Sequence, residues 1–414
     1  MTGGALGLAA ALRAREVGAV EVAHDLLARL ERLEPVIGAV AAIDPERTLA
    51  DAEASDRRLR TGEARPLEGV PFTVKDWIDA AGWPVAGGRP EHRDRRPEAD
   101  APAVARLRAA GGVVLAITRV LADSAAHGPT RNPHDPSRAP GGSSSGAAAL
   151  VAAEASPLAL GSDSGGSIRL PAAWCGVVGL KPTFGRVPLT GHFPRCGSLE
   201  DARTVIGPLA RTVNDCAAVL PLIAGPDGLD AGVVPVPLGD PSAVDPRSLR
   251  VAAVGGDPTG ATLAALAAAG ATVVDEAVPD VRDEALEITR RYWRRTQLTG
   301  EENMRFLWDW DRFRRRMLVA TANVDVLLTP AAEQVAPPWR ESAEEDYRWT
   351  LPWSLTGAPA VVVPVGTLDG LPVAVQVIGR PWQDHVALAA ARLIAASMPA
   401  LATADPARMS PGSP

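Results

Sequence analysis

The sequence predicts an α/β fold in which helices flank a central mixed β-sheet. Short apolar runs bounded by glycine and proline alternate with longer segments whose apolar residues recur at helical spacing. Residues 249–254, 262–269 and 272–275 follow the order strand, helix, strand, which is typical of a parallel pair with a crossover helix. Residues 372–378 follow a turn at 368–370 and pair back as an antiparallel hairpin. These observations indicate a layered α/β/α architecture.

Helices are expected where apolar residues recur every three or four positions, as Leu26, Leu30 and Leu33 do. The predicted helices cover residues 6–33 (two helices), 47–61, 101–109, 146–155, 262–269 and 385–396. The predicted strands cover residues 70–74, 112–117, 157–160, 249–254, 272–275, 324–328, 360–365 and 372–378. The first of these strands ends at Lys75, which places a lysine at its tip. Three prolines make residues 131–142 a loop.

The domain organisation is expected to be simple. The chain has 414 residues, 46% of them apolar, enough for a sizeable core. It shows neither an internal repeat nor a linker, so we expect a single domain over residues 1–401, with core motifs at 69–215 and 324–397. Residues 402–414 are expected to be a frayed tail.

Composition narrows the class of protein. A net charge of −7 without a long basic run argues against a nucleic-acid partner. Cys175, Cys196 and Cys216 form no C-x-x-C pair, so neither a disulfide framework nor a zinc site is suggested, and we expect no metal or cofactor. We find no signal peptide and no apolar run long enough for a membrane span, so a cytoplasmic protein is expected.

Only two of the 42 basic residues are lysines, Lys75 and Lys181. Arginine cannot be deprotonated in a protein, whereas a buried lysine can be. A lysine retained in an arginine-rich chain is therefore a candidate base, although an ordinary lysine or a salt bridge explains the count equally well.

Two glycine–serine turns carry the candidate chemistry: GGSSSG at residues 141–146 and GSDSGGSIR at residues 161–169. Each precedes a helix, where unpaired backbone N–H groups can hold an anion or an oxyanion. A flexible linker would adjoin polar sequence instead of apolar elements. A phosphate-binding loop would need a following lysine. An α/β-hydrolase elbow fits the G-x-S-x-G spacing, but a proline-rich loop stands where its strand should be.

None of the six histidines lies in a recognisable catalytic context. We expect surface or loop histidines at His24, His92, His127, His134, His192 and His385. A serine nucleophile would then need another base, and lysine is the natural substitute.

The sequence resembles the amidase-signature family over nearly its whole length, most weakly over residues 230–324. The matching motifs are GVPFTVKD (69–76), PGGSSSG (140–146), GSDSGGSIRLPAA (161–173), CGVVGLKPT (175–183), GPLARTV (207–213) and GLPV (370–373) with Gln376 and GRP (379–381). Several motifs in the right order make the resemblance specific. Lys181 falls in a structural stretch of the family and is not expected to be catalytic.

The resemblance implies a Ser–Ser–Lys triad on the layered amidase-signature fold. Ser167 matches the nucleophile, Ser143 the bridging serine after a cis peptide bond, and Lys75 the base. The backbone N–H groups of Ser164, Gly165, Gly166 and Ser167 would form the oxyanion hole. Ser144, Asp163 and Arg169 would fix the turns around them, and simple turn capping by these three residues is compatible with that role.

Departures from the family leave the substrate open. Trp77, Gly142 and Phe193 are candidates for the substrate pocket. Trp308 and Trp310 could also line it, although helix packing explains them as well. Arg119 stands where asparagine is usual, in a shortened loop that faces the acyl pocket in relatives.

The resemblance implies an amidase that acts on a small-molecule amide, without nucleic acid or membrane, and it leaves a homodimer open. Two other functions stay open: an A-subunit-like glutaminase of a tRNA-dependent amidotransferase, and a catalytically silent scaffold of the same fold.

Overall fold

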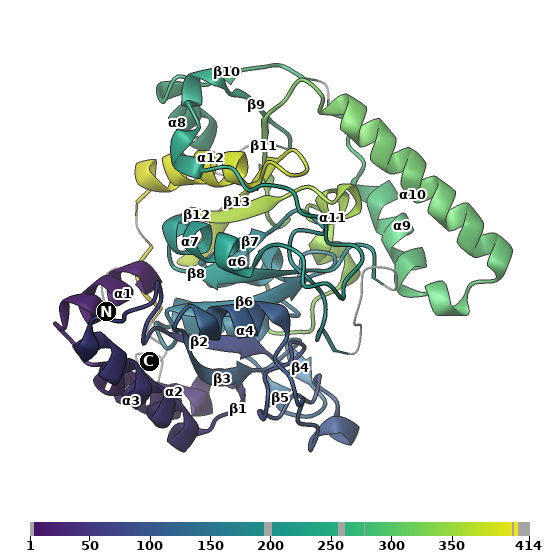
Figure 1. Ribbon diagram of the computed structural model, residues 1–414. Helices are drawn as coiled ribbons and strands as arrows, with labels where there is room; N and C mark the ends of the chain where they lie inside the picture. Colours follow the sequence, from purple (N-terminus) through teal and green to yellow (C-terminus); the bar gives the residue numbers. More distant parts are fainter. Residues whose placement is uncertain (1–3, 194–200, 256–260, 277, 400, 405–414) are drawn as a thin grey trace.

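The computed structural model describes residues 4–193, 201–255, 261–276, 278–399 and 401–404. An eleven-stranded sheet runs through the molecule in the order β1-β3-β2-β6-β8-β7-β12-β13-β11-β9-β10 (Figure 1). Its strands are β1 (Val40–Ala42), β2 (Pro71–Lys75), β3 (Val113–Thr118), β6 (Leu158–Asp163), β7 (Val178–Lys181), β8 (Val205–Ala210), β9 (Arg250–Ala253), β10 (Thr272–Val273), β11 (Val326–Pro330), β12 (Ala360–Leu368) and β13 (Leu371–Gly379). A separate pair joins β4 (Asp123–Ser124) to β5 (Gly128–Pro129).

The sheet is mixed, as predicted. Strand β2 runs parallel to β3 and β6, and β9 runs parallel to β10 and β11. The hairpin of β12 and β13 is antiparallel, and so are the pairings of β8 with β6 and β7. The predicted strand–helix–strand unit is present as β9, α8 and β10.

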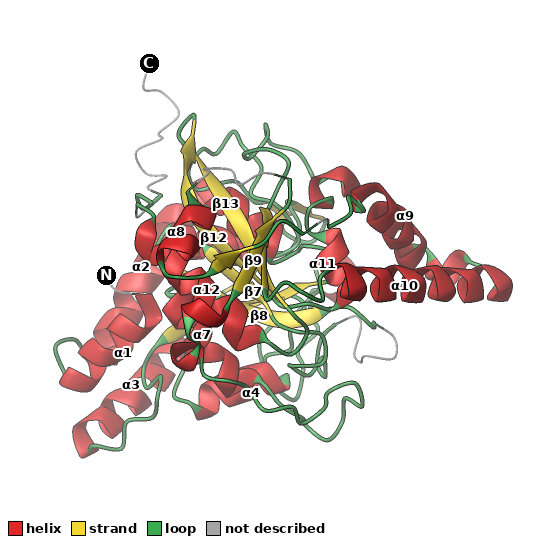
Figure 2. Ribbon diagram, turned by 90° about the horizontal axis from the view of Figure 1, so that it is seen from above, coloured by secondary structure: helices red, strands yellow, loops and turns green. Residues whose placement is uncertain are grey.

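Twelve α-helices occur in the described residues, and they cover both faces of the sheet (Figure 2). They are α1 (Gly4–Ala14), α2 (Ala19–Ile37), α3 (Pro45–Thr61), α4 (Pro102–Ala109), α5 (Ser145–Ala152), α6 (Arg169–Cys175), α7 (Val213–Ile223), α8 (Thr262–Ala268), α9 (Arg282–Trp293), α10 (Gly300–Ala320), α11 (Leu351–Thr356) and α12 (Asp384–Ser397).

Strand β12 shows how the two faces are filled. Val361 and Val363 belong to the large core that includes α12, whereas Val362 belongs to a second core with Ala172 of α6. Successive side chains of a strand point to opposite faces, so this alternation places α6 and α12 on opposite sides of the sheet. A third cluster joins α9, α10 and α11 at the edge of the molecule.

Three details complete the comparison with the expected elements. Thr403 donates to the carboxylate of Glu154 at 3.0 Å and Ala404 is buried, while residues 405–414 of the predicted tail lie outside the described residues. Cys175 and Cys216 are buried free thiols, and Cys196 lies outside the described residues. None of the described helices combines the length and hydropathy that a bilayer span requires.

Candidate active site

Lys75 ends the buried strand β2 and lies in the interior of the protein. Its side chain is fully buried. The Nζ atom lies 2.7 Å from the Oγ atom of Ser143 and 3.0 Å from that of Ser144, and it donates to the carbonyl of Ser162 at 3.2 Å. Because β2 lies between β3 and β6, the strand delivers the lysine to the end of β6, where the second glycine–serine turn begins. The two predicted turns and the lysine therefore meet.

Burial lowers the pKa of Lys75 well below its usual value, and the negative charge of Asp163 opposes this shift. The face of the Trp77 indole lies 4.4 Å from Nζ, so the environment on that side is aromatic. A carboxylate in direct contact would hold the ammonium charged, but the three oxygens that contact Nζ are neutral. The site therefore favours the neutral amine, which can accept a proton.

The turn that carries Ser143 is held by contacts from distant segments. The Gly142–Ser143 peptide bond is cis, as the family resemblance implied. Gly141 has φ +81°, and a Cβ atom there would come within 2.8 Å of the Pro171 backbone, so the position requires glycine. The Tyr347 hydroxyl donates to the Gly142 carbonyl at 2.8 Å.

Ser167 lies in the second turn, with its side chain half-buried and therefore accessible. The two turns are joined through the backbone, because the N–H of Ser144 donates to the carbonyl of Ser167 at 3.1 Å. Among the described residues, the Ser143 and Ser167 side chains make no hydrogen bond with each other. The structure thus brings Lys75 and Ser143 into direct contact and places Ser167 in the adjoining turn without a direct side-chain link.

The predicted oxyanion-hole residues, Ser164 to Ser167, form the turn between β6 and α6. Gly166 has φ +140°, and a Cβ atom there would come within 2.2 Å of the Thr350 hydroxyl oxygen. None of the four backbone N–H groups donates to another group in the described part of the chain. These donors remain available to an acceptor from outside, as an oxyanion hole requires.

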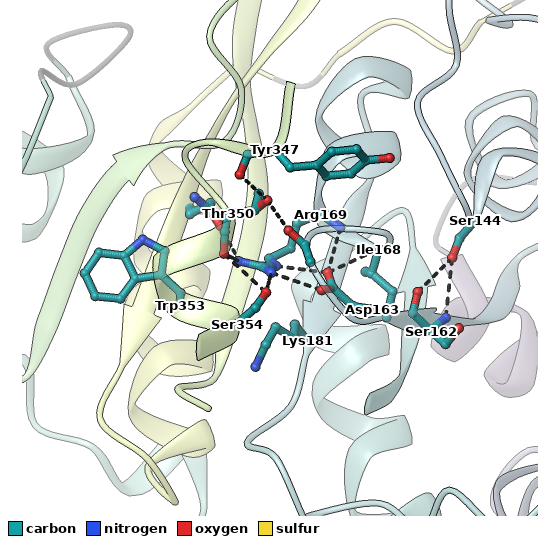
Figure 3. Close-up of polar contacts among 12 residues, drawn as sticks. Ser144, Ser162, Asp163, Ile168, Arg169, Lys181, Tyr347, Thr350, Trp353 and Ser354 are labelled. Atoms are coloured by element: carbon teal, nitrogen blue, oxygen red, sulfur yellow. Dashed lines mark hydrogen bonds and ion pairs between the residues drawn. The ribbon is translucent and has the colours of Figure 1, made fainter. Parts of the chain in front are cut away.

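Asp163 and Arg169 form a fully buried ion pair beside this turn (Figure 3). Asp163 accepts from the Arg169 guanidinium at 2.9 and 3.0 Å and from the backbone N–H groups of Ile168 and Arg169. Burial raises the pKa of Asp163, but the charges of Arg169 and Lys181 outweigh it and lower that pKa overall. The carboxylate therefore stays ionised and ties the two ends of the turn together.

Arg169 also connects the turn to the C-terminal part of the chain (Figure 3). Its guanidinium donates to the Thr350 carbonyl at 2.8 Å, the Gln376 side-chain oxygen at 3.0 Å and the Ser354 hydroxyl at 2.6 Å. The Thr350 hydroxyl in turn donates to the Gly165 carbonyl at 2.5 Å. Sequence reasoning missed Thr350 and Tyr347, because nothing in the local pattern of residues 347–356 signals contact with a turn so distant in the chain.

His192 lies in a loop, as expected, but in a buried one and not at the surface. Its side chain is only 3% exposed, and its Nε2 atom lies 2.9 Å from the Oγ atom of Ser162. The imidazole also meets the Trp77 indole edge to face, with 6.0 Å between the ring centroids. His192 thus lies behind the lysine, and no motif around it in the sequence could have revealed this position.

The candidates for the substrate pocket have varied surroundings. Trp77 donates through its indole N–H to the Gly87 carbonyl at 3.0 Å, and the Phe193 ring lies 4.2 Å from the Arg95 guanidinium. Gly142 is buried beside Tyr347. Trp308 is 61% exposed on α10.

Two other candidates for the pocket, Trp310 and Arg119, make contacts within the protein instead. Trp310 of α10 packs against Tyr292 and donates to the Leu355 carbonyl at 2.8 Å. Arg119 pairs with Glu34 at 2.6 Å. In the described residues, no group of three or more histidine, cysteine or acidic side chains is arranged to hold a metal ion.

Comparison with known proteins finds relatives of this chain in both sequence and structure. A family model described as Amidase matches residues 21–287 and 264–388. The A subunit of the glutamyl-tRNA(Gln) amidotransferase of Chloroflexus aggregans is 35% identical, over 91% of this chain and 93% of the relative. The native peptide amidase of Stenotrophomonas maltophilia superposes with a TM-score of 0.82 at 28% identity, covering 98% of both chains. A 6-aminohexanoate cyclic dimer hydrolase complexed with substrate gives 0.83 at 26% identity, covering 96% of this chain and 97% of that one.

Proposed function

This chain belongs to the amidase-signature family, and on that premise we propose that it hydrolyses the carboxamide bond of a small molecule through an acyl-enzyme on Ser167. Lys75 acts as the base and Ser143 as the proton relay. The single observation that carries the proposal is the contact between the buried Lys75 Nζ and the Ser143 Oγ at 2.7 Å. A hydroxyl that contacts a neutral amine can give up a proton to it, which the weak nucleophile serine needs.

In the acylation step, neutral Lys75 takes the Ser143 proton while Ser143 takes the Ser167 proton. The Ser167 oxygen attacks the amide carbon, and the N–H groups of the turn from Ser164 to Ser167 stabilise the resulting oxyanion. Ser143 then gives a proton to the leaving nitrogen and recovers one from Lys75, so that the amine departs neutral. Catalytic hydrogen bonds of this kind often form or shorten only when substrate is bound. The relay is therefore compatible with a structure in which the described Ser143 and Ser167 side chains are not hydrogen-bonded to each other.

In the deacylation step, water replaces the amine and gives its proton to Ser143, which passes one to Lys75. Hydroxide attacks the ester, the acid leaves, and Ser167 regains its proton through the same relay. Neither of these proposed steps uses a cofactor. Trp77, Gly142 and Phe193 remain the proposed contacts of the substrate, and the aromatic rings of Trp77 and Phe193 favour a substrate with apolar groups.

Reaction with a fluorophosphonate, followed by intact-mass measurement, tests the proposal. We expect one adduct on the wild-type chain, none on Ser167→Ala and none or a greatly slowed one on Ser143→Ala. A matched control is Ser164→Ala, which removes a hydroxyl from the same turn and should still be labelled. An unlabelled wild-type chain, or equal labelling of Ser167→Ala, would contradict the proposal. A panel of aliphatic, aryl and peptide amides and ureas then identifies the substrate class.

The relatives named as amidotransferase A subunits favour a second candidate, in which the chain releases ammonia from glutamine within a larger assembly. The chemistry at Ser167 would be the same, with glutamine as the amide. A glutaminase assay of the chain alone and with a candidate partner protein separates the two functions. Activity on glutamine that appears only with the partner supports this second candidate.

A further inference from the structure

Helix α10 lies at the outer edge of the molecule. Figures 1 and 2 show α9 and α10 projecting side by side as an arm, and in Figure 1 α10 lies farther from the sheet than α9. Its buried side chains, Phe306, Phe313 and Met317, pack into the cluster shared with α9 and α11. At 1.5 Å per residue, its 21 residues span about 31 Å. The opposite side of this long helix faces away from the rest of the chain.

That outer side has an unusual pattern for a solvent-exposed surface. Met304, Trp308, Asp311, Arg315 and Leu318, which together we call the seam, are all exposed, and they follow one another at intervals of four and three residues in alternation. This is the spacing of the contact positions in a coiled coil. Leu307 and Val319 flank the seam and are 49% and 77% exposed. Large apolar side chains at this spacing indicate a helix face that packs against another helix.

We propose that this seam pairs α10 with α10 of a second copy of the chain, antiparallel about a two-fold axis. In the register centred near Phe313, Trp308 faces Leu318 of the second copy and Leu307 faces its Val319. Asp311 then faces Arg315 of the second copy, and the two-fold axis repeats each contact. A two-fold interface must be self-complementary, and this arrangement meets that condition with both apolar and charged groups.

The charged residues of the seam favour a second copy of the chain, and not a lipid surface, as its binding partner. Asp311 and Arg315 already pair within the helix at 2.8 Å, in the middle of the apolar seam, with side chains 52% and 78% exposed. A bilayer would have to desolvate this pair without replacing its partners. A second copy offers each charge an additional opposite charge, as pairs at helix interfaces do.

The size of the surface sets the expected affinity. A contact between two helices of this length lies at the low end of specific interfaces, below about 1,200 Å². We therefore expect a dimer that forms reversibly in the micromolar range, and not an obligate assembly.

Sedimentation velocity of the full-length chain from about 1 to 100 µM tests the proposal. We expect the wild type to shift from one to two chain masses over this range. Asp311→Arg should stay monomeric because the arginine placed at position 311 would face Arg315, and Arg315→Asp should stay monomeric because two aspartates would face each other. An equimolar mixture of these two variants should form a heterodimer, since every cross-contact then joins an arginine to an aspartate. Neither variant has the ion pair within its own helix, so only a contact between copies explains this rescue.

Arg305→Asp is the matched control, because it makes the same kind of charge change on the same helix outside the seam and should dimerise like the wild type. Trp308→Ser should stay monomeric with an unchanged circular dichroism spectrum. A wild type that is monomeric at every concentration, or a mixture that fails to pair, would overturn the proposal. Cosedimentation of the wild-type monomer with phosphatidylcholine–phosphatidylglycerol vesicles, lost in Trp308→Ser, would assign the seam to a membrane surface instead.

Discussion

The Nε2 atom of His192 lies 2.9 Å from the Oγ atom of Ser162, although the residues are 30 positions apart. The carbonyl of the same serine accepts a hydrogen bond from Lys75 at 3.2 Å. The imidazole is thus two contacts away from the proposed base, and it also supports the indole that lies over that base. We regard His192 as a positioning residue that holds Ser162 and Trp77 around Lys75.

Replacing His192 should therefore impair turnover more than binding. We predict that His192→Ala lowers kcat by up to about 100-fold with little change in KM, because small displacements of reacting groups are costly. His192→Gln, whose amide can still bond Ser162, should recover part of the loss. Steady-state kinetics on the identified substrate measures both, with the exposed His24→Gln as control. A KM effect alone, or equal losses in Ala and Gln, would argue for a purely structural role.

Lys75→Arg should abolish activity although it keeps a basic side chain at this position. A guanidinium cannot accept the proton, so we expect a loss of at least about 100-fold in kcat/KM. Lys75→Met should be equally inactive and no less stable than the wild type, because it removes an amine that burial disfavours in its charged form. Activity assays and thermal unfolding of both variants check this. An active Lys75→Arg enzyme would exclude lysine as the base.

The Asp163–Arg169 pair should be costly to break. Both side chains have no exposed surface, so removing one partner leaves the other charge buried. Asp163→Asn and Arg169→Met should each lower the free energy of unfolding by roughly 3–5 kcal/mol. Denaturant unfolding measures the change, with Asp245→Asn in the exposed Asp245–Arg247 pair as a control that should change little. Equal effects at the two pairs would show that burial is not what makes the first one important.

Local motifs in the sequence located the elements of the candidate site better than those that surround it. Lys75, Ser143 and Ser167 stand in local motifs, and the strand before Lys75 is a short apolar run, so their elements could be recognised from neighbouring residues. Strand β8 was missed because Gly207 and Pro208 ordinarily argue against a central strand. Here the pairing of β8 with β6 and β7 overrides that local preference.

Contacts between distant segments could not be predicted from the sequence either, because they also depend on tertiary packing. Thr350 and Tyr347 reach the two turns only because α11 and the residues before it fold over them. His192 lies in a stretch without helical or strand pattern, and only tertiary packing places it behind Lys75.

Lys181 gives a prediction about stability and pH. Burial, with the nearby charge of Arg169, lowers its pKa to about 7, while Asp163 and Asp384 oppose the shift. Between pH 7 and about 10.4 the unfolded chain holds a proton here that the folded chain does not, so this lysine makes the free energy of unfolding rise with pH. Lys181→Met should lose this contribution. Denaturant unfolding of both proteins at several pH values measures this contribution. If the difference in the free energy of unfolding between wild type and variant does not increase between pH 7 and about 10.4, the lowered pKa of Lys181 is contradicted.

The central claim concerns the charge of Lys75, and the composition makes it directly measurable. With only two lysines in the chain, lysine labelled with carbon-13 at Cε gives two side-chain NMR signals, and Lys181→Met assigns them. We predict that the Lys75 signal titrates well below the usual pKa of about 10.4, with a midpoint that matches the rise of kcat/KM with pH. A Lys75 signal that stays charged up to about pH 10.4, while the enzyme is fully active at pH 7, would contradict the account.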